Sequence, residues 1–316
     1  MKGRTALEWI GLSVLGIVLF HFQVTILIFV IPLVILYKRQ GYAYGIFGSL
    51  LVLFGIAGFK IVQGINIEGS LRGGLLLLDM EYPFTFLLGI ALVEAPYLQK
   101  YPVFEKMALA TLCAGVLGIP LIRYVLNDPV FDAYMKAQIN AMLKSVVEGE
   151  GSLDLGSAVS ISTGEIVRLS KKIFANTYTV GYFLTLLINW TIGSRIGMRT
   201  LGYLQVKVME PVHLPEKVIW GFLLGWLGVL VSLWKDMEWI GILAWNVALL
   251  GTVLYGLQGV DILRFILRRM ERFRSMVIFA IILCLFMPGL NIIILIGVPL
   301  LGVSDLWIQY DREERS

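Results

Sequence analysis

The chain has 316 residues, of which 58% are hydrophobic and only 15% are charged, and its formal net charge is +4. Soluble domains carry about 25% charged residues, so this composition excludes an ordinary water-soluble globular protein. The small net charge does not indicate nucleic-acid binding either. We therefore expect an all-α membrane protein, a polytopic helical bundle whose main partner is the lipid bilayer.

The first apolar stretch, Trp9–Tyr37, holds 29 uncharged residues and is interrupted by His21–Gln23 and Pro32. A straight helix of that length would measure about 43 Å, against a hydrocarbon core of about 30 Å. We expect a bent helix or a hairpin of two short helices. A run this long behind Lys2 and Arg4 also argues against a cleavable signal peptide.

Several further stretches can each cross a bilayer as one helix, which needs roughly 20 mainly apolar residues. The six expected spans are at about 43–65, 76–98, 106–125, 175–195, 217–235 and 238–259. A second 29-residue stretch, Met276–Ser304, contains Met287–Gly289 with Pro288 at its centre, which a helix can follow only with a kink or a break. Together these stretches predict about eight membrane segments in a single integral membrane domain, 1–316, with bent or hairpin-like first and last stretches.

The cations predict the orientation of these spans. If the loop with Lys38 and Arg39 is cytoplasmic, six following spans keep most of the other short basic loops on the same side, as the positive-inside rule requires. The last of these loops is the basic segment 260–275, into which the helix of the preceding span is expected to continue. Its cytoplasmic anchor comprises Arg264, Arg268, Arg269, Arg272 and Arg274. Lys106 and Lys207 are expected inside and Glu148 outside.

The longest polar segment, 127–172, is expected to hold two external amphipathic helices that lie over the outer face of the bundle. Asp128 followed by Pro129 is typical of a helix start, with Asp as the N-cap. Ser162 and Glu165 have the spacing of a capping box and predict a second helix start. The apolar face of the first helix comprises Val130, Tyr134, Met142, Leu143 and Val146.

Motifs for common enzyme chemistry are absent from the sequence. It contains no HExxH, no paired Cys/His spacing and no GxxxxGK[ST], and Gly193–Gly197 has its serine in the wrong place for GxSxG. We therefore expect no enzyme, no cofactor and no metal site. Cys113 and Cys284 lie inside apolar runs, where they are expected to pack as small hydrophobic residues rather than to form a disulfide.

Polar residues inside or beside the spans are the remaining functional candidates, because an ionisable group in a span costs roughly 2.5–3.5 kcal/mol. The candidate ligand-binding residues are Asp79, Glu81, Asn189, Asn246 and Gln258. For the two acids the alternative is a solvated interfacial loop. For the three amides the alternative is hydrogen bonding between helices, which contributes about 0.6 kcal/mol on average. Glu94 is expected to reach towards Lys100.

Asn246 and Gln258 are 12 residues apart, which places them about 120° apart around one straight helix. A single solute pocket cannot easily use both. We therefore predict that they are mainly structural, and that Gln258 hydrogen-bonds the backbone near Met287–Asn291 or near Gly302–Asp305.

The C-terminal third carries a recognisable pattern of Leu214-Pro215, Asn246, Leu254–Gly259 before a basic stretch, and Gly302–Trp307. Over about residues 210–312 it resembles the YybS-like family of bacterial multispanning membrane proteins. That family is grouped with the S components of energy-coupling-factor vitamin transporters and, more loosely, with the cell-shape protein MreD. The resemblance implies an S-component-like bundle in the bacterial cytoplasmic (inner) membrane. The chain is longer than the usual S component, and its first apolar run lacks the Ala-xxx-Ala ladder used for docking on the coupling protein.

Two functions are expected, the first from this resemblance and the second from small-residue ladders such as Gly221-xxx-Gly225 together with the basic cytoplasmic segment. The first is a small-solute binding or transport component, which would need a partner coupling protein with an ATPase because the sequence holds no phosphate-binding loop. The second is a non-transport scaffold or assembly factor, MreD-like, that contacts another membrane protein through its helices.

Overall fold

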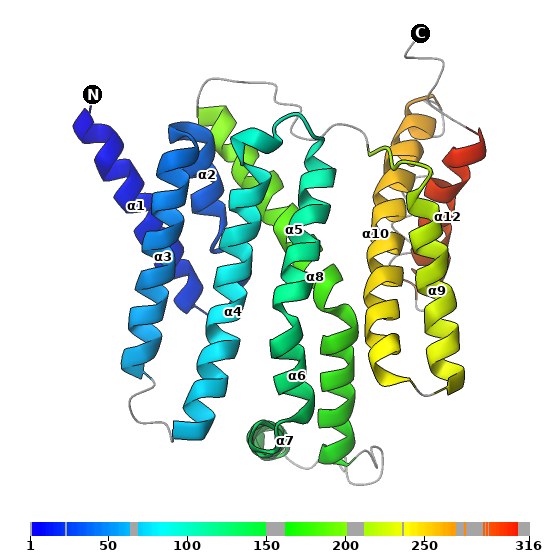
Figure 1. The fold of residues 1–316 in the computed structure, drawn as a ribbon, viewed down its shortest axis with the longest axis horizontal. Helices are drawn as coiled ribbons and strands as arrows, with labels where there is room; N and C mark the ends of the chain where they lie inside the picture. The colour runs from blue at the N-terminus through cyan, green and yellow to red at the C-terminus, as the bar shows by residue number, and fades with distance from the viewer. Residues whose placement is uncertain are drawn as a thin grey trace. The chain divides into compact units, whose positions relative to one another are not determined.

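The computed structural model describes residues 2–22, 24–63, 69–149, 162–200, 212–235, 237–269, 275, 287, 289 and 291–308. Within these residues the regular structure is helical, and no strand occurs among them. The chain divides into two compact units, Met1–Val208 and Met209–Ser316 (Figure 1), and each is described by itself.

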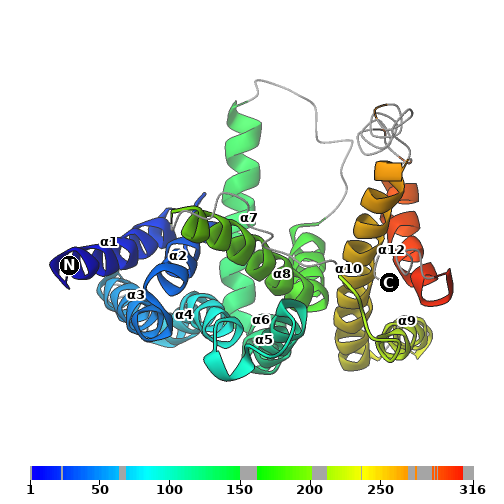
Figure 2. The same cartoon turned by 90° about the horizontal axis from the view of Figure 1, so that it is seen from above.

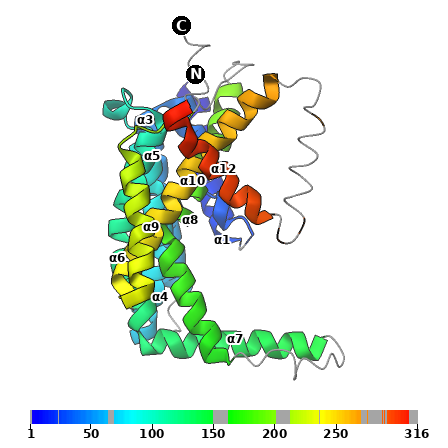
Figure 3. The same ribbon diagram turned by 90° about the vertical axis from the view of Figure 1, so that its right-hand side faces the viewer.

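Unit 1 contains most of the helices. Its elements are α1 (Lys2–His21), η1 (Ile26–Ile28), α2 (Ile31–Gln40), α3 (Tyr42–Gln63), α4 (Gly69–Val93), η3 (Pro96–Leu98), α5 (Val103–Leu117), α6 (Ile119–Asn127), α7 (Pro129–Gly149) and α8 (Thr163–Thr200). Helices α3, α4, α5 and α8 run along one common direction, whereas α7 leaves the base of the unit sideways (Figures 1 and 3).

The N-terminal apolar stretch forms a hairpin, which is one of the two forms that its length and interruptions predict. Helix α1 descends to His21, η1 lies in the connection, and α2 returns towards the end of the unit where the chain begins (Figure 1). Both helices pack against α3 at Gly48, where an added Cβ would lie 3.0 Å from Ser13 Oγ and 2.5 Å from Leu36 Cδ2. Helix α2 has only ten residues, about 15 Å, and is too short to cross a bilayer.

The prediction of about eight membrane segments is not supported. By length and apolar composition, four described helices can cross a membrane: α3, α9 (Val218–Lys235), α10 (Glu238–Arg269) and α12 (Asn291–Ile308). Helices α5 and α6, bent by 42° at Gly118, add a fifth span if they are taken together. The count falls short because the predicted spans at about 76–98 and 175–195, which correspond to α4 and α8, are not among these candidates. In addition, the first apolar stretch forms two short helices, α1 and α2, in place of a full span.

Both helix starts predicted in the segment 127–172 are present. Asp128 Oδ1 accepts a hydrogen bond from the Phe131 backbone N–H at 2.8 Å. Glu165 N–H donates to Ser162 Oγ at 3.2 Å, and Ser162 N–H donates back to Glu165 Oε2 at 3.0 Å, which makes the capping box. The helix that begins there is α8, which continues for 38 residues to Thr200, so that 163–172 form its first turns.

Unit 2 is built on closely packed glycines. Helices α9 and α10 form an antiparallel hairpin, and an added Cβ at Gly225 would lie 2.8 Å from the Ala248 backbone nitrogen. Helix α12 crosses α10 even more closely, because an added Cβ at Gly259 would lie 1.9 Å from the Val298 carbonyl oxygen. Helix α10 extends ten residues beyond Gly259 into the basic segment, as the sequence predicts.

Candidate functional site

A row of polar contacts joins α4 to α8 in unit 1. This polar seam begins with Glu81 and Thr85 on α4 and with Tyr178 and Tyr182 on α8. The Tyr178 hydroxyl donates to the Glu81 carboxylate, and the Tyr182 hydroxyl donates to the Thr85 carbonyl at 2.9 Å. Gly89 makes room for this contact, since an added Cβ there would lie 2.0 Å from the Tyr182 hydroxyl oxygen. The candidate residue Glu81 is therefore tied to a neighbouring helix.

The seam continues to the break in the N-terminal hairpin. Asn189 on α8 is only 1% exposed, and its Nδ2 donates to the Leu27 carbonyl of η1 at 2.7 Å and to the Thr185 carbonyl at 2.8 Å. The Tyr82 hydroxyl of α4 reaches the Ile26 carbonyl at 3.5 Å. Non-helical backbone at membrane depth is tolerated only where protein groups or water satisfy its polar atoms. Asn189 and Tyr82 supply such groups here.

Two acceptor atoms beside this break are buried and have no hydrogen-bond partner among the described residues. One is Asn189 Oδ1, because both bonds of this amide use Nδ2. The other is His21 Nε2 at the end of α1. His21 Nδ1 lies 2.7 Å from the Ile17 carbonyl oxygen, so Nδ1 carries the proton and Nε2 is an acceptor in the neutral ring.

An ion pair closes the seam at its other end. Lys38, near the end of α2, contacts Glu94 just after α4, with an Nζ to Oε1 distance of 2.8 Å. Trp190 Nε1 of α8 donates to the same carboxylate at 2.7 Å, and Lys38 Nζ lies 5.2 Å from the centroid of the Trp190 ring. Glu94 thus binds Lys38 rather than reaching towards Lys100, and it links three helical segments.

Asp79, another candidate ligand residue, forms an ion pair with Lys60 of α3 at 2.9 Å. The Asp79 side chain is 44% exposed and the Lys60 side chain is 24% exposed. A pair this exposed contributes little to stability. Asp79 and Glu81 therefore point to different partners, on α3 and α8 respectively.

In unit 2, Gln258 joins three parts of the chain. Its Nε2 donates to Asp305 Oδ2 of α12 at 2.9 Å, and its Oε1 accepts from the Leu214 backbone N–H at 3.3 Å. Asp261, one turn on, accepts from the Val212 N–H at 3.0 Å and from Arg264 Nη1 at 3.0 Å. The predicted contact near Gly302–Asp305 is present, but it uses the Asp305 carboxylate, and the backbone partner is Leu214.

Asn246 is 7% exposed and donates through Nδ2 to the Ile242 carbonyl of its own helix at 2.8 Å. Of the predicted cytoplasmic anchor, Arg264, Arg268 and Arg269 lie in the last turns of α10. Arg272 and Arg274 lie outside the described residues.

The hydrogen bonds of Gln258 and Asn246 are each expected to stabilise the folded protein. We expect Gln258→Leu to lower the melting temperature of the detergent-solubilised protein by removing about 1–2 kcal/mol of hydrogen bonding, and Asn246→Leu to lower it separately. The two positions are about 18 Å apart along α10, so the effects should add in the double variant. A double variant no less stable than Gln258→Leu alone would contradict two independent contacts.

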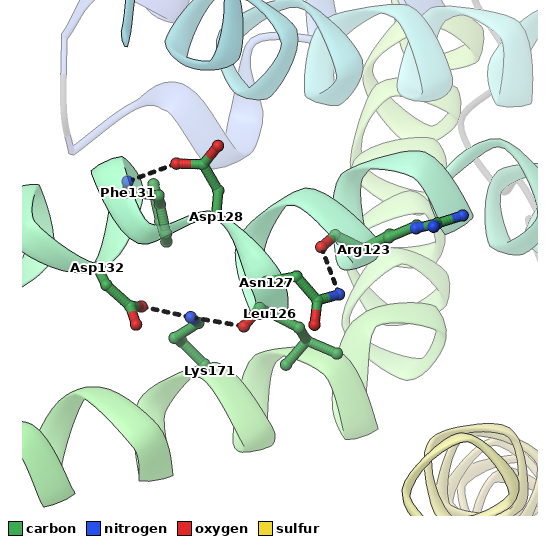
Figure 4. Close-up of polar contacts among 7 residues, drawn as sticks. All are labelled: Arg123, Leu126, Asn127, Asp128, Phe131, Asp132 and Lys171. Atoms are coloured by element: carbon green, nitrogen blue, oxygen red, sulfur yellow. Dashed lines mark hydrogen bonds and ion pairs between the residues drawn. The ribbon is translucent and has the colours of Figure 1, made fainter.

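A buried lysine forms the corner from which α7 leaves the unit (Figure 4). Lys171 of α8 is 7% exposed, and its Nζ donates to the Leu126 carbonyl at the end of α6 at 2.9 Å and to the Asp132 carboxylate of α7. Beside it, Phe131 packs on the buried residues Leu121 and Val125. One ammonium group therefore fixes α6, α7 and α8 together.

Lys171→Met should destabilise this corner by about 2 kcal/mol, because hydrogen bonds to charged groups contribute about 1.5–3 kcal/mol and Asp132 stays partly hydrated. The neighbouring Lys172 is exposed, so Lys172→Met should change stability by less than about 0.5 kcal/mol. Thermal unfolding and limited proteolysis between α6 and α8 measure the effect. Equal behaviour of the two variants would show that the corner does not depend on Lys171.

The five predicted ligand residues are divided between the two units. Asp79, Glu81 and Asn189 belong to unit 1, while Asn246 and Gln258 belong to unit 2. Tyr178, Tyr182 and Trp190 were not predicted from the sequence as residues of this seam. A usable signal was present, because Tyr178, Tyr182, Thr185 and Asn189 follow the i, i+4, i+7, i+11 spacing of one helix face.

The fold and these contacts define an all-helical protein with several helices long and apolar enough to cross a membrane, which indicates a membrane-embedded protein. A scan against protein-family models, a search of curated proteins and a search of solved structures each find no match to this chain.

Proposed function

We propose that the protein is a membrane-embedded binding component for a small solute, resembling transporter S components, and that the ligand binds at the hairpin break beside Asn189. The observation that carries this proposal is the buried Asn189 Oδ1, an acceptor without a hydrogen-bond partner among the described residues at a break between helices. Leaving such an acceptor unsatisfied costs about 1–3 kcal/mol, and a bound donor removes that cost.

The break between helices supports this function. Tyr82 of α4 contacts η1 at the break, and discontinuous helices form the substrate and ion sites of many transporters. The two acceptors, Asn189 Oδ1 and His21 Nε2, favour a solute that carries N–H donors, such as a primary ammonium group. Transport would require a partner ATPase, because the sequence has no phosphate-binding loop.

Thermal-shift measurements on the solubilised protein test this site. Ammonium and small primary amines should raise the melting temperature, whereas tetramethylammonium, which has the charge but no N–H donor, should not. A ligand at about a hundred times its Kd stabilises by about 2.7 kcal/mol. Asn189→Ala should abolish the shift, and Asn246→Ala, a matched buried asparagine in unit 2, should keep it.

Absence of any shift with every amine, together with native mass spectra that contain only lipid and detergent adducts, would overturn the ligand site. A shift that survives in Asn189→Ala would place the binding elsewhere in the chain.

The second candidate function is a membrane scaffold or assembly factor. It is favoured by the pairing of Asp79, Glu81 and Gln258 within the protein, which uses their polar groups for packing rather than for a ligand. In-membrane crosslinking should then recover another membrane protein. Recovery of lipid alone would count against the scaffold.

A further inference from the structure

Helix α7 extends sideways, away from the other helices of unit 1 (Figures 2 and 3). It leaves at the end of the unit opposite to the N-terminus and the turn between α2 and α3 (Figure 1). A helix that runs across the direction of the spanning helices, at one end of them, has the direction of a helix lying in a membrane surface.

The direction of α7 is fixed at two points along its length. Near its start, Lys171 links Asp132 to the end of α6, and Asp128 caps the first turn. Two turns later, Thr163 at the start of α8 donates to Asn140 Oδ1 at 2.8 Å. The contacts of the first part of α7 therefore determine the direction of the helix beyond Asn140.

One face of α7 points towards the core of unit 1 at Phe131 and carries Gln138 and then Met142 further along the helix. Phe131 is 7% exposed and packs, with Met135, among the side chains of α6 and α8. Met142 is eleven residues after Phe131, which places it only about 20° away around the helix. Met142 thus lies on the core-facing side, where 72% of its side chain is exposed.

We propose that the end of α7 around Met142 rests in the boundary between headgroups and acyl chains of the bilayer, with this face turned towards the hydrocarbon. At Phe131 this face of α7 contacts the packed core of unit 1. Further along α7, beyond the packed helices, the same face is turned towards the lipid that surrounds the spanning helices. Interfacial helices bury their apolar face about 5–10 Å into this boundary. The proposal requires membrane embedding but not the solute site near Asn189.

Site-directed fluorescence on the full chain tests the proposal. The native cysteines are first replaced by Cys113→Ser and Cys284→Ser. A single new cysteine is then introduced in each of two variants, Met142→Cys and Ala137→Cys. Each variant is labelled with an environment-sensitive dye and reconstituted into phosphatidylcholine/phosphatidylglycerol vesicles. Ala137 is exposed and lies about 140° from Met142 around α7, so it is the matched control. The dye at 142 should be blue-shifted and quenched by a shallow acyl-chain spin label about twofold more than the dye at 137.

Equal quenching of the two dyes by lipid-borne and water-borne quenchers would overturn the proposal. A dye at 142 that is shielded from water but not quenched by lipid would also overturn the proposal. In that case protein, such as a second copy of the chain, would cover this face. Lys171→Met in the Met142→Cys background should reduce the lipid quenching, whereas Lys172→Met should leave it unchanged.

Discussion

Gly259→Val is expected to separate α12 from α10 and to destabilise unit 2 by about 3 kcal/mol or more. An added Cβ at Gly259 would lie 1.9 Å from the Val298 carbonyl oxygen and 3.1 Å from the Gly302 backbone nitrogen. These are backbone atoms of the facing helix, so no side-chain rotation relieves the overlap. Overpacking a tight contact costs about 1–3 kcal/mol, and more where the backbone itself must move.

The same crossing predicts a matched set of variants. Gly302→Val should be as damaging as Gly259→Val, since its Cβ would lie 2.0 Å from the Tyr255 carbonyl oxygen. Gly256, one turn away on α10, meets only Pro299 Cγ at 3.7 Å, so Gly256→Ala should be tolerated. Thermal unfolding, with proteolysis at the ends of α12, measures all three. A Gly259→Val protein as stable as Gly256→Ala would show that the helices are further apart.

The contacts between α10 and α12 also show which features could be predicted from the sequence and which could not. Gln258 and Asp305 both belong to the C-terminal sequence pattern, and a contact between these two regions was predicted from the sequence. Helical periodicity tells which side of α10 Gln258 occupies, but it does not tell which atom of the facing segment meets it. The contact with Leu214 could not be predicted, because it depends on the path of the chain before α9.

Local signals predicted local structure well. The Asp128 cap and the Ser162–Glu165 capping box involve neighbours three residues apart, and both form as expected. The same signals could not tell that the helix beginning at Thr163 continues unbroken to Thr200. Its charged first turns resemble a loop in hydropathy, yet they hold the corner through Lys171, whose partners lie 39 and 45 residues away.

The contacts of the candidate site could not be predicted from neighbouring residues either, because the residues that form them are far apart in the sequence. Asn189 could be recognised as a buried polar residue, but its partner Leu27 is 162 residues earlier in the chain. The hairpin itself was one of two forms compatible with a 29-residue apolar run. Only packing against α3 and α8 selects it, since a ten-residue helix such as α2 has little stability by itself.

The largest electrostatic effect is expected at Lys38 and Glu94. Lys38→Met should destabilise unit 1 by about 2–3 kcal/mol, because it removes the ion-pair partner of a carboxylate that is only 13% exposed and leaves Lys106 as the nearby cation. Removing one partner of a fully buried pair costs about 3–5 kcal/mol, and the 22% exposure of Lys38 reduces that figure. Trp190 still donates one hydrogen bond to Glu94, which also limits the loss.

A double-mutant cycle separates this pairing from simple loss of packing. Glu94→Gln keeps the shape of the side chain and can still accept from Trp190, so together with Lys38→Met it removes both charges. The double variant should be more stable than Lys38→Met alone, with a coupling energy of about 1–3 kcal/mol. The exposed pair Lys60 and Asp79 is the control, and its cycle should give less than about 1 kcal/mol. Equal coupling in the two cycles would mean that Glu94 is hydrated, and that α2 is held against α4 and α8 by its apolar contacts alone.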